Sequence, residues 1–70
     1  MFTMLQAGES ALIRRIRAEF LEMPDLMVTR WQATRLWNLD PLECGHALET
    51  LVRRSFLTET RHGAYRRANS

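Results

Sequence analysis

The feature that most constrains the fold is a pair of helix-start signals that follow each other closely. Thr29 is followed three residues later by Gln32, and Asp40 is followed by Pro41 and Glu43. In each case the first side chain can cap a backbone N–H while the later one reaches back, which is the capping-box pattern. Pro41 also suits the first helical position, where its missing N–H costs nothing. The sequence therefore predicts two successive helices.

The segment between these two signals predicts a tight turn. Asn38 follows Trp37, and Asn adopts the left-handed conformation that ends a helix more readily than any residue except Gly. The helix that starts at Thr29 is thus expected to be short. The next helix should run from Asp40 to about Arg54 with an inward stripe of Cys44, Ala47, Leu48, Leu51 and Val52. Two helices joined in this way have the spacing of a helix-turn-helix.

An earlier helix is predicted from Ser10 to Met23. Its apolar residues recur at intervals of three and four, and they are Leu12, Ile13, Ile16, Phe20 and Met23. Pro24 ends the helix because the residue before a proline is disfavoured in helical geometry. A short extended segment, residues 25–28, is expected to lead into the next helix.

The end of the chain changes to a strand-like pattern. Residues 56–60 and 65–67 are expected to form a hairpin, in which Gly63 supplies the positive φ of a tight turn. The resulting fold class is mainly α with a small β wing. Residues 10–67 are expected to form one domain, preceded by a helical or flexible segment (1–9) and followed by a disordered tail (68–70).

A resemblance to a known family rests on these elements. The stretch from Thr29 to Leu57, followed by residues 61–65, resembles a bacterial winged helix-turn-helix domain. From Arg14 to Arg67, with residues 22–24 and 35–40 as motifs, the chain is also similar to a group of short, largely uncharacterised bacterial proteins. The resemblance implies a three-helix winged helix-turn-helix with a C-terminal hairpin. Thr34 and Asn38 stand where such domains usually carry Ala and Gly, which affects the crossing of the two helices.

Double-stranded DNA is the expected partner. All ten basic residues are Arg, a residue suited to phosphate and guanine edges, although the formal net charge is only +2. The third helix would read bases and the Arg-rich hairpin would contact phosphates. On that helix Leu42 and Glu49 also face outward, and both Glu43 and Glu49 would repel phosphates. The predicted DNA-binding residues are Arg30, Glu43, Gly45, His46, Arg53, Arg54, Arg61, His62, Arg66 and Arg67.

Other interpretations of the same residues stay open. The outward side of the third helix could be a solvated face, and the hairpin arginines could protect an edge strand from pairing. The acidic third helix would also suit a module that binds proteins and no nucleic acid. Phe2, Met4 and Trp31 are candidates for the contact of a homodimer, or they could pack over the first helix.

Several function classes are not expected. Cys44 is the single cysteine, so no internal disulfide can form, and it lies on the predicted inward stripe beside Leu48. A buried thiol is a poor nucleophile, and Cys44 with His46 and His62 is a weak metal-ligand set. We therefore expect no enzyme, metal, cofactor, small-molecule ligand or membrane span, and a cytoplasmic location. Trp37 is expected in the core.

Overall fold

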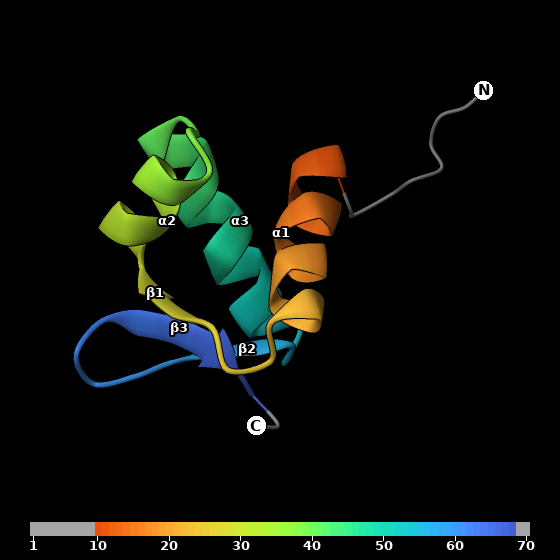
Figure 1. The fold of residues 1–70 in the computed structure, drawn as a ribbon, viewed down its shortest axis with the longest axis vertical. Helices are drawn as coiled ribbons and strands as arrows, with labels where there is room; N and C mark the ends of the chain where they lie inside the picture. The colour runs from red at the N-terminus through yellow and green to blue at the C-terminus, as the bar shows by residue number, and fades with distance from the viewer. Residues whose placement is uncertain (1–9, 69–70) are drawn as a thin grey trace.

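The computed structural model describes residues 10–68, and this part of the chain contains three helices and a three-stranded antiparallel sheet. The elements follow in the order α1 (Ala11–Glu22), β1 (Met27–Thr29), α2 (Arg30–Leu36), α3 (Pro41–Arg53), β2 (Leu57–Glu59) and β3 (Ala64–Arg67). The helices lie side by side and the sheet closes one end of them (Figure 1). The expected hairpin is present, but β1 joins it, so the fold is mixed rather than mainly helical.

Helix α1 begins and ends close to the predicted residues. The Ser10 hydroxyl accepts a hydrogen bond from the backbone N–H of Ile13 at 3.2 Å, and Ile13, Ile16 and Phe20 are buried as predicted. Met23, the last residue of the apolar repeat, is not buried with them, because its side chain is 45% exposed. The helix ends before Met23, since Pro24 excludes helical geometry there, and the residue leaves the helical periodicity.

Both helix-start signals form caps in the structure. At α2, Gln32 donates its N–H to the Thr29 hydroxyl at 3.1 Å, and Thr29 donates its own N–H to the Gln32 side chain at 2.9 Å. At α3, the N–H of Glu43 donates to the Asp40 carboxylate at 3.0 Å, with Pro41 in the first turn. These bonds satisfy backbone donors that a helix start leaves without partners.

The turn between α2 and α3 has the predicted left-handed residue. Asn38 has φ of 53°, and the N–H of Leu39 donates to the Thr34 carbonyl at 3.0 Å. Together with the bond from Asn38 N to the Arg35 carbonyl at 3.4 Å, this is a Schellman motif. The motif reverses the chain tightly enough for α3 to begin only a few residues after α2 ends.

The sheet has the order β1-β3-β2, with both pairs antiparallel. Tyr65 on the central strand faces Val28 on one side and Glu59 on the other. The hairpin turn is closed by a hydrogen bond from Gly63 N to the Thr60 carbonyl at 3.0 Å, and Gly63 has φ of 83°. Ala68 was expected to lie in the tail, yet its N–H donates to the Phe56 carbonyl at 3.0 Å. Backbone pairing therefore continues past β3.

The core is formed where the three helices and the sheet meet. The side chains of Phe20 and Trp37 contact edge to face, with ring centroids 6.1 Å apart. Trp37 is only 7% exposed, and Cys44 is fully buried beside Leu48, as predicted. Tyr65 and Leu57 contribute to this core from the sheet. The core thus joins α1, α3 and the hairpin into one body.

Candidate functional site

The outer face of α3 is the first part of the candidate site. Glu43, His46, Glu49 and Arg53 are exposed along this helix, and Leu42 is 82% exposed at its start. Arg53 also donates to the Thr50 hydroxyl at 3.4 Å, and that hydroxyl donates to the His46 carbonyl at 2.9 Å. The helix therefore presents a ridge that mixes apolar, acidic and basic side chains.

Gly45 does not belong to this exposed ridge, in contrast to the prediction. It is buried because the side chain of Arg30, the first residue of α2, lies across it. A Cβ at position 45 would stand 2.5 Å from Arg30 Nη1 and 2.8 Å from Arg30 Cδ. Glycine thus allows the guanidinium of Arg30 to lie against the backbone of α3, and it leaves no open backbone for a ligand.

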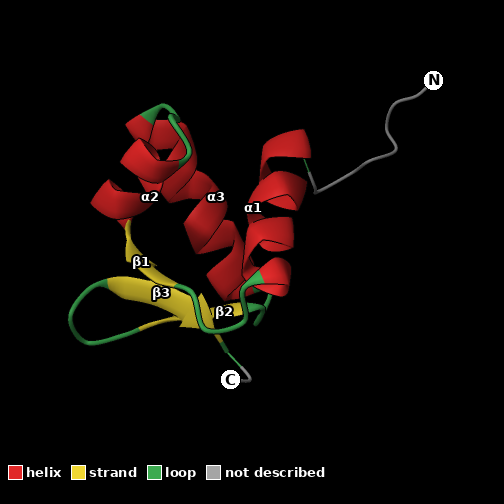
Figure 2. Cartoon of the chain, in the orientation of Figure 1, coloured by secondary structure: helices red, strands yellow, loops and turns green. Residues whose placement is uncertain are grey.

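The predicted basic residues do not form a single cluster. Arg61 and His62 are exposed in the hairpin turn, which lies at the opposite end of the sheet from the C-terminal end of β3 (Figure 2). Arg67 is near that C-terminal end, where its guanidinium lies 5.0 Å from the centre of the Phe56 ring. Arg54 follows the last residue of α3. The positive charge is therefore divided between the two ends of the hairpin.

Arg66 lies on the side of the sheet that faces away from the helices. Its register partners are Met27 and Thr58, both of which are exposed, whereas the neighbouring Tyr65 is buried against the helical core. Successive residues of a strand point to opposite faces. The sequence could not show this, because it did not reveal β1 as a pairing partner.

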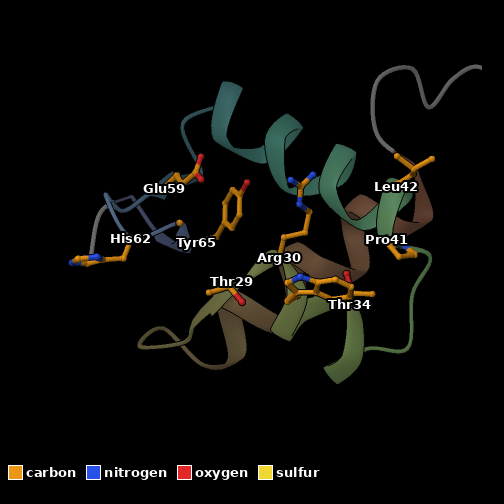
Figure 3. A pocket seen from close by; sticks show the side chains of 10 residues that line it. Thr29, Arg30, Thr34, Pro41, Leu42, Glu59, His62 and Tyr65 are labelled. Carbon is orange, nitrogen blue, oxygen red and sulfur yellow. The ribbon is translucent and has the colours of Figure 1, made fainter.

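A groove between α2, α3 and the hairpin was not predicted. Its volume is about 510 Å³, and it is lined by the start of α2, by Pro41 and Leu42 of α3, and by Glu59, His62 and Tyr65 of the hairpin. Pro41 and Leu42 lie at one end and the hairpin residues at the other, with Arg30 between them (Figure 3). Trp31 also lines the groove and is 70% exposed. The sequence features that could have indicated this groove are two apolar residues at outward-facing positions, Trp31 and Leu42.

Charges around the groove act on Tyr65. Burial raises the pKa of the Tyr65 hydroxyl above its ordinary value, and the carboxylate of Glu59 raises it further. Arg30 lowers the pKa of Tyr65, and Glu49 raises it. Glu59 and Arg30, which both line the groove, therefore act on the Tyr65 hydroxyl in opposite directions.

Thr34 lies at the floor of the same groove and is only 8% exposed. Its hydroxyl is the one buried side-chain polar atom among residues 10–68 that has no hydrogen-bond partner. A buried hydroxyl without a partner costs about 1–3 kcal/mol. The position where related domains were expected to carry Ala therefore holds an unsatisfied polar group next to a cavity.

The remaining predicted features are placed as follows. Phe2 and Met4 lie outside the described residues, so only Trp31 of the expected dimer contact can be located. Between residues 10 and 68, no three His, Cys, Asp or Glu side chains are grouped closely enough to hold a metal ion. None of the described helices has the length and apolar character needed to span a membrane.

Comparisons with known proteins do not assign the face of α3 or the groove to a known kind of site. Neither a family model, nor a curated protein, nor a solved structure matches the chain.

Proposed function

We propose that this protein is a small DNA-binding transcription regulator with a winged helix-turn-helix fold. The observation that carries the proposal is the arrangement of α2 and α3 around the Asn38 turn, with the outer face of α3 exposed and a β-hairpin beside it. A helix of this kind can enter the major groove while a hairpin contacts the adjacent backbone.

The exposed side chains suggest a division of roles. His46 and Arg53 on α3 can donate hydrogen bonds to guanine or phosphate, and Leu42 can contact a thymine methyl group. Arg61 and His62 in the hairpin turn would contact phosphates. The carboxylates of Glu43 and Glu49 oppose phosphate, so we expect modest affinity and two copies on one site.

A protein-interaction module is the second candidate. The observation that favours it is the groove that Trp31, Leu42 and Glu59 line, because exposed apolar side chains beside a carboxylate suit a polypeptide better than a phosphate backbone. DNA binding and protein binding differ in their dependence on salt.

The test is the fluorescence anisotropy of a labelled random-sequence duplex, titrated with the protein at several salt concentrations. A protein that neutralises phosphates loses affinity linearly on a logarithmic salt scale. We expect Arg61→Ala to weaken binding and to lower the slope by about one, since it removes one phosphate contact. Glu49→Gln should strengthen binding because it removes a repulsive charge.

Arg14→Ala is the matched control, because Arg14 is an exposed arginine on α1, a helix to which no DNA contact is assigned. It should leave the slope unchanged. Affinity that does not depend on salt, or an equal loss from Arg14→Ala and Arg61→Ala, would contradict the proposal. The stoichiometry of the same titration shows whether two copies bind.

A further inference from the structure

The groove between α2, α3 and the hairpin has an apolar end, a charged end and an unsatisfied polar group at its floor. We propose that it binds an extended peptide segment of a partner protein, which inserts one bulky apolar side chain and places one basic side chain against the hairpin. This peptide-binding role rests on the second candidate function, the protein-interaction module, and does not depend on DNA binding.

The apolar end supplies the anchor site. Trp31 is 70% exposed and Leu42 is 82% exposed, and both line the groove together with Pro41. Large apolar side chains that gather around a concave surface commonly mark an interaction site, and Trp is enriched among residues that contribute strongly to binding. A volume of about 510 Å³ holds a side chain of the size of Leu or Phe together with part of its backbone.

The charged end favours a basic residue. Figure 3 shows Glu59, His62 and Tyr65 together at this end of the groove. Glu59 lines this end of the groove and is exposed, so its carboxylate is accessible to a ligand. The opposing guanidinium of Arg30 is held against Gly45 on α3. A Lys or Arg side chain of the peptide would therefore be placed to pair with Glu59.

Thr34 supplies the third, independent observation. Its hydroxyl is buried at the floor of the groove without a hydrogen-bond partner. Peptide amides both donate and accept hydrogen bonds, so the backbone of a bound segment can satisfy this hydroxyl once the side chains that cover it shift. Trp31 lies three residues earlier on α2, on the same side of the helix, and its high exposure leaves it few contacts that would prevent it from shifting as a ligand enters.

The test uses fluorescein-labelled, capped hexapeptides of Gly and Ser that carry one Leu and one Arg at different separations. Binding to the full chain is followed by anisotropy. Matched peptides replace Leu with Ala or Arg with Glu. We expect at least one peptide to bind saturably, the Ala peptide to bind about tenfold more weakly and the Glu peptide about fivefold more weakly.

Variants of the protein locate the site. Trp31→Ala and Glu59→Gln should lower the affinity for the peptide that binds. Thr34→Val should lower this affinity about fivefold without lowering the denaturation midpoint, because Val keeps the shape of Thr and removes the hydroxyl. Leu21→Ala is the control, since Leu21 is 53% exposed on α1, and it should have no effect. Equal binding by wild type and all three groove variants would overturn the proposal.

A random-sequence duplex is the second arm of the experiment. If the duplex binds with the Arg61-dependent salt slope while no peptide of the panel saturates, the peptide site is wrong and the DNA-binding proposal stands. If a peptide binds and the duplex does not, the DNA-binding proposal is wrong and the peptide site stands. Self-association of the chain that Trp31→Ala abolishes, with no peptide bound, would identify a second copy as the occupant and overturn the proposed partner.

Discussion

Tyr65 shows how one residue connects the core with the candidate site. Its ring is buried on the central strand of the sheet, and the charges of Glu59, Arg30 and Glu49 act on its hydroxyl. The phenol is therefore neutral in the folded state over a wider pH range than in the unfolded chain. Ionising it requires a negative charge to form in a region that is desolvated and already contains carboxylates.

This pKa shift predicts a loss of stability in alkali. The folded-state pKa of Tyr65 is raised, so the stabilisation is fully present below the unfolded pKa, about 10, and is lost as the pH rises through the folded pKa. The free energy of unfolding of the wild type, measured by urea titration, should fall as the pH rises above about 10. The fall should be smaller in Tyr65→Phe. Parallel pH profiles for the two proteins would contradict this expectation.

The C-terminal ends of α2 and α3 both form a Schellman motif, with different residues in the left-handed position. After α3, Ser55 has φ of 66°, and the N–H groups of Ser55 and Phe56 donate to the carbonyls of Val52 and Leu51 at 2.9 and 3.0 Å. This Schellman motif matches the one at Asn38 but was not predicted, because Ser is not typical of left-handed positions. The contacts of Phe56 and Leu57 with the core hold the chain in this turn.

At the scale of an element, the start of α3 depends on Asp40. Asp40→Ala should lower the free energy of unfolding by roughly 1 kcal/mol, because the N–H of Glu43 loses its acceptor. Asp40→Asn keeps an acceptor and should cost less. Urea denaturation followed by circular dichroism measures both variants. Equal stability of Asp40→Ala and wild type would mean that this cap does not stabilise α3.

The molecule as a whole depends on one small core. A domain of this size has a limited stability, often about 3–5 kcal/mol, since little apolar surface can be buried. Leu48 is fully buried, and it packs in a cluster that includes residues of all three helices and all three strands. The loss of a single core side chain therefore affects every element.

Leu48→Ala should accordingly cost about 2–5 kcal/mol and leave the protein largely unfolded. The matched control is Leu42→Ala on the same helix, where the side chain is 82% exposed and little stability should be lost. Thermal denaturation by circular dichroism compares the two. A cooperative transition of Leu48→Ala near that of wild type would show that the core tolerates the cavity.

The sequence by itself determined the helices, their N-terminal caps, the Asn38 turn and the hairpin. These features depend on side chains and backbone groups only a few residues apart, so local patterns are sufficient to predict them. The tertiary structure alone decided that β1 pairs with β3, that Arg30 covers Gly45, and that Arg66 faces away from α3. Trp31, Thr34, Leu42 and Glu59 meet around one groove for the same reason. Their proximity depends on how distant elements pack, which no local pattern records.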